Sequence, residues 1–187
     1  MYHIKKDKRC LKSAEAITGG LEVMLQHKNY ADISISDILR VSRVGRATFY
    51  RLFDTVDDVV VYKIDQIMQE IMNDYRQVPY EEFTRGFLKM LFVRSGEWIN
   101  IVSAGRMDLI IHSMRNSLEN MLEHDQVPKD SEADYRLAVF SGAALSLIVA
   151  WNEKGREQSI DELASVLDKY LDLDALAADQ TLINDPR

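Results

Sequence analysis

The sequence predicts an all-helical protein of about nine helices, with a small N-terminal helix-turn-helix head before a larger helical body. Three observations support this fold class. Apolar residues recur at intervals of three and four along most of the 187-residue chain, which is the spacing of one helix face. Only three prolines and eight glycines interrupt the chain. In addition, no segment alternates apolar and polar residues as a half-buried strand would.

The first helix is expected over residues 8–27, where an apolar stripe recurs at helical spacing. Gly19 and Gly20 lie inside this helix. Each glycine costs a helix interior about 1 kcal/mol relative to alanine. Either another backbone therefore packs closely at this point, or the helix is locally weak.

Two short helices around a tight turn are expected between Ser34 and Phe53. Ser34, followed three residues later by Asp37, is a capping-box signal for the first of them. The second is expected to begin near Val44 or Gly45. Such a pair is the helix-turn-helix plan of many DNA-binding proteins.

Capping signals and glycine or proline breaks separate the remaining helices. They are expected at 55–76, at 79–95, within 96–105, at 106–124, at 131–154 and from 159 to about 174. A second capping signal, Thr55 with Asp58, opens the first of these, and Ser159 with Glu162 opens the last. The helix at 131–154 is apolar on two faces, so it needs to be covered twice.

Charge is divided unevenly along the chain. Residues 1–53 carry ten Lys and Arg against five acidic residues, a net charge of +5. The rest carries 13 basic and 25 acidic residues, or −12, which gives the total of −7. This asymmetry fits a small head that faces a polyanion on an acidic body, although chance clustering on solvated faces is an alternative that charge alone leaves open.

The second helix of the helix-turn-helix has two distinct faces. Its apolar residues are expected to bury against the two helices before it, and they are Phe49, Leu52 and Phe53. The opposite face is basic, aromatic and partly small, and it consists of Arg43, Arg46, Ala47, Tyr50 and Arg51.

The outward face has what a reader of the DNA major groove needs. Arg46 or Arg43 is able to pair bidentately with a guanine edge, and Ala47 permits close approach or meets a thymine methyl. Other polar side chains are better placed for phosphates, which fix register rather than sequence. The expected phosphate contacts are Ser34, Ser36, Thr48, Tyr50 and Arg51, with Lys5, Lys6 and Lys8 adding electrostatic attraction.

Three runs resemble, in order and spacing, the N-terminal signature of TetR/AcrR-type transcriptional regulators. They are Ser34-Ile-Ser-Asp-Ile, Val44-Gly-Arg-Ala-Thr-Phe-Tyr-Arg-Leu-Phe and Thr55-Val-Asp-Asp-Val. The resemblance covers about residues 8–60 and is most specific at Thr48-Phe49-Tyr50 and Phe53. It implies a dimeric DNA-binding protein, with Thr48 and Tyr50 at phosphates and with Arg46 and Ala47 facing the groove.

Three positions depart from the family pattern. Arg43 stands where the turn usually has glycine, and a left-handed conformation there would cost about 1 kcal/mol or more. Gly45 replaces the usual serine cap, a loss of a few tenths of a kcal/mol. Val56 replaces a common phosphate-binding lysine, so we expect that contact to be missing, with the N-terminal lysines compensating electrostatically.

The resemblance also implies a division of labour along the chain. We expect a DNA-binding domain at 1–54 and an effector-binding and dimerisation domain at 55–187, with an effector tilting the helix at 55–76 to change the spacing of two heads. Candidates for the walls of an apolar effector cavity, which equally suit a plain core, are Phe87, Met90, Leu91, Trp98, Met107, Ile110, Ile111, Met114, Phe140 and Trp151.

Family members dimerise through their last two helices. Small residues at 138, 142 and 146 would allow close approach across a two-fold axis. The expected interface residues are Ala138, Gly142, Leu145, Ser146, Val149, Leu163, Leu167 and Tyr170. Such a dimer predicts a pseudo-palindromic operator, because two recognition helices then meet one face of the DNA.

Other classes of function find less support in the sequence. The motifs of serine hydrolases, zinc proteases, phosphate-binding loops and dinucleotide-binding folds are absent, so we expect no enzyme, cofactor or metal site. No segment reaches the ~18 uncharged apolar residues of a membrane helix, and we expect a cytoplasmic protein. The alternative is a helical interaction module or co-regulator that needs a partner protein, motivated by Arg43 and Val56.

Overall fold

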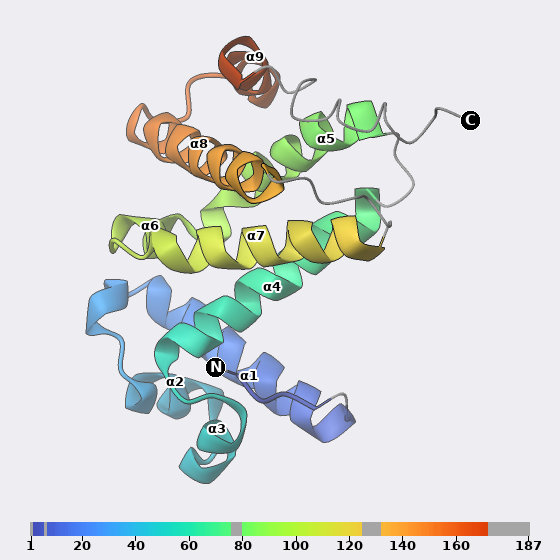
Figure 1. Ribbon diagram of the computed structural model, residues 1–187. Helices are drawn as coiled ribbons and strands as arrows, with labels where there is room; N and C mark the ends of the chain where they lie inside the picture. The colour runs from blue at the N-terminus through green and yellow to red at the C-terminus, as the bar shows by residue number, and fades with distance from the viewer. Residues whose placement is uncertain (1, 6, 76–79, 125–131, 172–187) are drawn as a thin grey trace, which may run out of the picture. The chain divides into compact units, whose positions relative to one another are not determined.

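The computed structural model describes residues 2–5, 7–75, 80–124 and 132–171, and these residues form helices and their connections without a strand. The elements are α1 (Lys8–Leu25), η1 (Tyr30–Asp32), α2 (Ile35–Ser42), α3 (Arg46–Leu52), α4 (Val56–Tyr75), α5 (Tyr80–Val93), η2 (Arg94–Glu97), α6 (Ile99–Ser103), α7 (Met107–His124), α8 (Ala133–Glu153) and α9 (Ile160–Leu171). The all-α prediction is confirmed, and the expected helices lie within a few residues of the observed ones (Figure 1). The short 3-10 turns η1 and η2 were not predicted.

The chain divides into two compact units. We call Met1–Gln66 with Asn100–Ile110 the N-terminal unit, and Ile67–Ile99 with Ile111–Arg187 the C-terminal unit. Helices α4 and α7 each contribute residues to both units. The expected boundary between residues 54 and 55 concerns function rather than compactness, and it stays a prediction.

The core of the N-terminal unit forms where α1 packs against α2 and α3 (Figure 1). One face of α1 is buried, and Ile38 and Phe49 from the other two helices are 0% exposed. A Cβ at Gly20 would stand 3.0 Å from the Ile38 carbonyl oxygen, whereas Gly19 has open space. Close backbone approach therefore explains Gly20, which settles the alternative that the sequence left open at this position.

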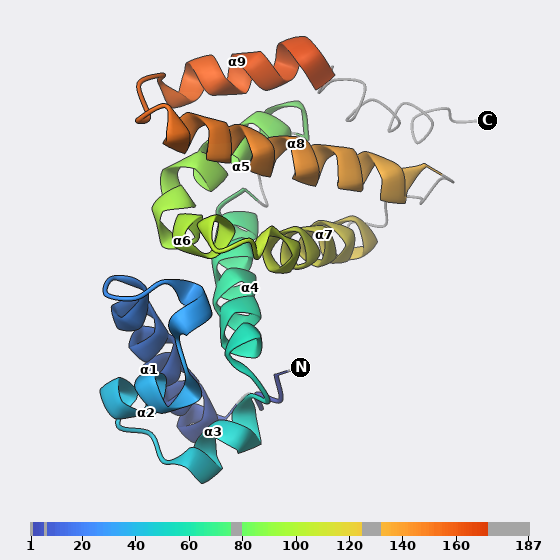
Figure 2. The ribbon, with the colours of Figure 1, turned by 90° about the vertical axis from the view of Figure 1, so that its left-hand side faces the viewer.

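In the C-terminal unit, α8 and α9 lie side by side, and α5 packs against α9 (Figure 2). The rings of Phe92 and Trp151 meet edge to face, 5.7 Å between centroids, and the Trp151 indole N–H donates to the Gln158 carbonyl at 2.9 Å. Ser159 and Glu162 form the predicted capping arrangement before α9.

Helix α8 is less covered than its composition would suggest. Tyr135 and Val139 on its outer side are 73% and 52% exposed. The stretch Asp134–Glu153 is long and apolar enough to cross a membrane by length and composition, and 33% of it is buried. Core helices of soluble proteins often have the same length and composition. The sequence predicts that α8 is covered on two faces. On the second face Leu145 is 1% exposed, whereas Ala138 and Ser146 are exposed in the described chain.

Candidate nucleic-acid interface

The start of α2 is fixed by a capping box. The Asp37 amide N–H donates to Ser34 Oγ at 3.2 Å, and the Ser34 amide and hydroxyl donate to Asp37 Oδ2 at 3.1 and 2.7 Å. The Lys28 ammonium lies 3.1 Å from the same carboxylate oxygen. These contacts, the Ser34 hydroxyl first, lower the pKa of Asp37 to about 2. The predicted cap is confirmed, and it engages the one hydroxyl proton of Ser34.

The turn between α2 and α3 holds a strained residue. Arg43, the C-cap of α2, has φ 57° and ψ 23°, the left-handed conformation that costs a side-chain-bearing residue about 1–2 kcal/mol. Gly45 then begins α3 as an N-cap without a side-chain hydrogen bond. The first turn of α3 therefore lacks the side-chain acceptor that a Ser cap supplies.

Helix α3 separates its two faces as the sequence predicts. Phe49 and Leu52 are 0% and 1% exposed, whereas Tyr50 is 48% exposed. The outward residues Arg43, Arg46, Ala47 and Arg51 are exposed, and Thr48 is half-buried. One pair of candidate residues is brought together, because Arg46 Nη2 donates to Ser36 Oγ at 2.7 Å. The resting guanidinium is thus held on the exposed α2–α3 surface.

The joint between α3 and α4 is closed by hydrogen bonds from backbone amides to side-chain oxygens. Asp58 Oδ2 accepts from the amides of Asp54 and Thr55, both at 3.0 Å, and Thr55 Oγ1 accepts from the Asp58 amide at 3.2 Å. The predicted capping signal is confirmed. Val56 is half-buried in the first turn of α4.

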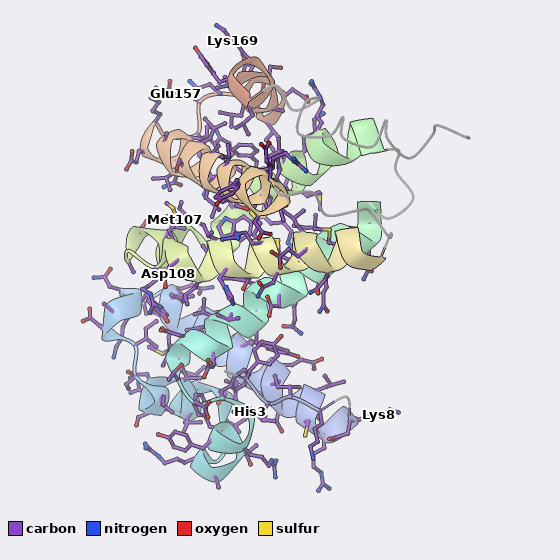
Figure 3. All side chains as sticks on the ribbon, viewed as in Figure 1. His3, Lys8, Met107, Asp108, Glu157 and Lys169 are labelled. Atoms are coloured by element: carbon purple, nitrogen blue, oxygen red, sulfur yellow. The ribbon has the colours of Figure 1, made fainter. Side chains whose placement is uncertain are left out.

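The N-terminal segment contributes contacts that the sequence did not reveal. Lys5 and Lys8 are exposed as expected, and Lys6 lies outside the described residues. The His3 amide donates to the Leu52 carbonyl at 2.8 Å, at the end of α3 (Figure 3). No local pattern signals a contact between residues so far apart in the chain.

A second group of contacts ties residues 100–110 into the N-terminal unit. Arg106 Nη1 lies 2.6 Å from Asp57 Oδ2 in the first turn of α4, and Arg106 also donates twice to Asp108 at 3.0 Å. The Tyr30 hydroxyl donates to the other oxygen of Asp57, and burial with this hydrogen bond raises the pKa of Tyr30. We call Tyr30, Asp57 and Arg106 the Arg106 clasp.

The expected effector residues differ in burial. Leu91, Trp98, Ile110 and Met114 are 0% exposed, and Phe140 and Trp151 are each 8% exposed. Met90, Met107 and Ile111 are half-buried, and the side chain of Phe87 lies outside the described part of the structure. Met107 and Ile110 belong to the N-terminal unit and the others to the C-terminal unit. An open groove of about 400 Å³ is lined instead by Asp161, Glu162, Ser165, Val166 and Lys169 of α9.

Four buried polar side-chain atoms of the C-terminal unit have no hydrogen-bond partner among the described residues. They are Ser95 Oγ, Trp98 Nε1, Ser113 Oγ and Arg115 Nε. Leaving such a group unpaired costs about 1–3 kcal/mol. The described residues hold no cluster of three or more His, Cys, Asp or Glu that suits a metal ion.

The expected dimer residues fall into two sets. Ala138, Ser146 and Tyr170 are exposed, and Gly142 and Val149 are half-buried. Leu145, Leu163 and Leu167 are 1%, 4% and 5% exposed, so these leucines pack within the C-terminal unit. Tyr135, Val139 and Val166, which the sequence reasoning left out, are exposed on the same two helices.

Comparison with known proteins gives one curated relative and several solved structures of similar fold. No protein-family model matches the chain. The chain is 24% identical over 176 residues to the uncharacterized HTH-type transcriptional regulator YxbF of Bacillus subtilis, a match over 89% of this chain. It spans about half the length of that relative, because the match covers 46% of YxbF.

Two solved structures resemble the chain over most of both lengths. Lin0861 from Listeria innocua has a TM-score of 0.76 at 21% identity, covering 89% of this chain and 93% of its own. A TetR transcriptional regulator from Streptococcus agalactiae has a TM-score of 0.59 at 19% identity, covering 86% of this chain and 94% of its own. Together with the helix order and the helix-turn-helix geometry, these likenesses show that the chain has the fold of a TetR-type transcriptional regulator.

Proposed function

We propose that this protein is a TetR-type transcriptional regulator that represses transcription by binding a pseudo-palindromic operator as a dimer, rather than an enzyme. The observation that carries the proposal is the exposed basic and aromatic face of α3. Its back is fully buried against the head, so Arg46, Ala47 and Tyr50 project from a rigid support. A short helix of this kind suits the DNA major groove.

Within this proposal, Arg46 binds the edge of a base, and the small side chain of Ala47 allows the helix to come close to the bases. Arginine pairs bidentately with guanine O6 and N7. Thr48, Tyr50, Arg51 and the lysines of the N-terminal segment contact phosphates. Ser36 accepts from Arg46 in the free protein, which supports a role in orienting that side chain. Ser34 would have to release Asp37 in order to donate to a phosphate.

Dimerisation through α8 and α9 is supported by their exposed apolar residues. Tyr135, Val139 and Tyr170 are each more than half exposed, and small residues lie among them on α8. A second copy of the same surface would cover the apolar face that the described chain leaves open. We assign the interface to these outward residues and not to the leucines buried between the helices.

Control by a small organic effector in the C-terminal unit is supported by its buried unpaired polar atoms. The indole N–H of Trp98 is a donor only, so the group it lacks is an acceptor. An apolar ligand that carries a carbonyl, ether or hydroxyl oxygen would satisfy it. Met90 and Met114 belong to the same unit as Trp98, and methionine side chains adapt readily to the shape of an apolar ligand.

The Arg106 clasp is the proposed route from effector to head. Gly105, with φ 80°, lies in the turn between α6 and Arg106, and the Arg106 amide donates to the Ile101 carbonyl at 3.1 Å. A shift of α6 would therefore move the guanidinium that holds Asp57 at the start of α4. Only an effector that binds the two resulting states with different affinity is able to change DNA binding.

The corresponding functional domains are residues 1–54 for DNA binding and 55–187 for effector binding and dimerisation, in a cytoplasmic protein. Residues 55–66 and 100–110 pack within the N-terminal unit and would act as the connection.

The proposal is tested by binding to DNA from upstream of the protein's own gene. We expect specific binding over random DNA, lost with rising salt because phosphate contacts release counterions. Arg46→Ala should lower specific affinity about 5- to 100-fold, the equivalent of one good base contact. Tyr50→Phe should weaken binding less and uniformly across sequences. Arg40→Ala, which removes an exposed arginine from α2 outside the proposed base contacts, is the matched control.

The second candidate is an interaction module or co-regulator that needs a partner protein. The strained Arg43 and the valine at position 56 favour it, because both depart from a DNA-binding pattern. Failure of the purified protein to prefer upstream DNA over random DNA at low salt would favour this candidate and contradict free operator binding.

A further inference from the structure

We infer that Tyr2 and His3 form a strap that positions the recognition helix from its C-terminal end, and that specific DNA binding depends on it. This inference rests on the proposed function for its DNA-binding part. The strap itself is a matter of contacts within the N-terminal unit. Tyr2 and His3 are thus positioning residues, which act through α3 without being assigned any contact to DNA.

The first contact of the strap is on the backbone of α3. The last carbonyls of a helix have no partner within the helix and need one from outside. The His3 amide supplies it for Leu52, the last residue of α3, at 2.8 Å. The His3 ring Nε2 lies 3.1 Å from Asp54 Oδ2, two residues further along the chain. The segment that precedes α1 in the chain thereby caps the C-terminal end of the recognition helix.

The second contact is on α4. The Tyr2 hydroxyl donates to Asp65 Oδ2 at 2.8 Å, and its ring meets Tyr62 edge to face with centroids 5.1 Å apart. Burial first, and then the Asp65 carboxylate, raise the pKa of Tyr2, so the hydroxyl stays a proton donor at neutral pH. Two successive residues therefore bridge α3 and α4, because His3 contacts the end of α3 and Tyr2 contacts α4.

A chain of aromatic contacts leads from the strap to the proposed DNA-binding surface. Tyr62 packs on Phe53 at 5.7 Å, Phe53 on Phe49 at 5.8 Å, and Phe49 on Tyr50 at 5.6 Å between centroids. Phe53 and Phe49 are 0% exposed, whereas Tyr50 is 48% exposed. Close-packed side chains transmit displacement, so a shift at Tyr2 reaches Tyr50 through three buried rings.

The other end of α3 explains why a strap is needed. The helix has seven residues, fewer than a helix needs to persist alone in water. It begins at a glycine without a side-chain cap and follows the left-handed Arg43. Beside the buried Phe49 and the Arg46–Ser36 hydrogen bond, the contacts that orient this helix therefore lie at its C-terminal end, where the strap, Phe53 and the Asp58 cap converge.

The experiment compares Tyr2→Ala and Tyr2→Phe in the full chain. Amide hydrogen exchange is measured without DNA, and binding is measured to upstream and to random DNA at one salt concentration. His27→Ala, at an exposed position beyond α1, is the control. Tyr2→Phe keeps the ring on Tyr62 and removes only the hydrogen bond to Asp65.

We expect Tyr2→Ala to speed exchange in residues 46–54 roughly tenfold while α1 keeps its protection, the change for losing one aromatic pair and one charge-assisted hydrogen bond. Specific affinity should fall on the order of tenfold, with binding to random DNA unchanged, because phosphate contacts tolerate reorientation better than a base contact. Tyr2→Phe should keep most of the wild-type protection of residues 46–54 and most of the specific DNA affinity. His27→Ala should change neither of these two quantities.

Two results would overturn the strap. Unchanged exchange at residues 46–54 in Tyr2→Ala would show that Tyr2 does not hold α3. Faster exchange spread equally over the whole head, with specific and random DNA weakened alike, would reduce Tyr2 to general stability. If wild-type protein shows no DNA preference, the proposed function and the strap's role in DNA binding fall together, while the exchange result still decides whether the strap holds the helix.

Discussion

The two ends of the recognition helix are built in opposite ways. Before α3, the turn contains a left-handed arginine, and the N-cap is a glycine that lends no side chain. After α3, Phe53 is fully buried, Asp58 caps the next helix, and His3 pairs with the Leu52 carbonyl. Strain and missing caps thus gather at one end of α3, and burial and hydrogen bonds at the other.

This difference shows how a short helix is both fixed and adaptable. The C-terminal joint determines where α3 lies, because the stabilising contacts are there. The N-terminal turn has no side-chain cap, and its Arg46 donates a hydrogen bond to Ser36 of α2. A helix held in this way is able to adjust its first turn to DNA at small cost, which fits residues whose expected partners are bases and phosphates.

The largest change in stability is expected from a substitution in the joint between α3 and α4. Phe53→Ala removes a fully buried ring and should lower the stability of the head by about 3–5 kcal/mol. Both tryptophans, Trp98 and Trp151, belong to the C-terminal unit, so tryptophan fluorescence follows that unit and not the head. Amide exchange in α1 and α3 is therefore the measurement.

Tyr50→Ala is the matched control for Phe53→Ala, because it removes a half-exposed ring from the same helix. It should leave exchange in α1 nearly unchanged and weaken DNA binding. Equal loss of protection in the two variants would contradict the assignment of stability to the joint and of recognition to the outward face.

A smaller loss is expected at the cap of α4. Thr55→Ala removes the acceptor of the Asp58 amide and should cost about 0.5–2 kcal/mol, the usual worth of an N-cap side chain. Thr55→Ser keeps the hydroxyl and should retain most of the stability. Urea unfolding followed by amide exchange at 56–60 measures the difference, and a Thr55→Ala protein as stable as wild type would show that the joint does not depend on its cap.

The features that the sequence predicted correctly are local ones. The Ser34–Asp37 and Thr55–Asp58 boxes need only a spacing of three residues, and the split of α3 into two faces follows from helical periodicity. Arg43 was singled out because it stands in the turn where the family pattern has glycine, and it has the left-handed conformation that the pattern implies. Each of these inferences uses neighbours in the chain, which the sequence displays directly.

The strap and the clasp could not be predicted in this way. Tyr2 and Asp65 are 63 positions apart, and Asp57 and Arg106 are 49 apart. Neither pair has a motif, and any tyrosine or arginine has many acidic partners available in the sequence. Periodicity also shows that a leucine is buried without showing against what, which is why Leu163 and Leu167 were expected at an interface and lie instead within their own unit.

Substitution of Arg43 by glycine, at the N-terminal end of α3, should raise the stability of the head. Arg43→Gly relieves the left-handed conformation and should stabilise the head by about 1 kcal/mol. Arg43→Lys keeps a side chain and a charge in the same conformation, so it should give no such gain. Urea unfolding of the head separates the two variants. Because Arg43→Gly also removes a proposed DNA contact, it should combine higher stability with weaker DNA binding, and a loss of stability would show that the guanidinium outweighs the strain.

The smallest effect is expected at Gly45. A Cβ there meets nothing within 4 Å, and φ −69° with ψ 146° is an ordinary N-cap conformation, so a serine fits without displacement. A Ser cap exceeds a Gly cap by only a few tenths of a kcal/mol, so Gly45→Ser should slow amide exchange in the first turn of α3 by less than about threefold. Gly45→Ala offers no acceptor and should not slow it. A serine that stabilised α3 as strongly as the Thr55 cap stabilises α4 would mean that the start of the recognition helix, and not its strapped end, decides how firmly the helix is held.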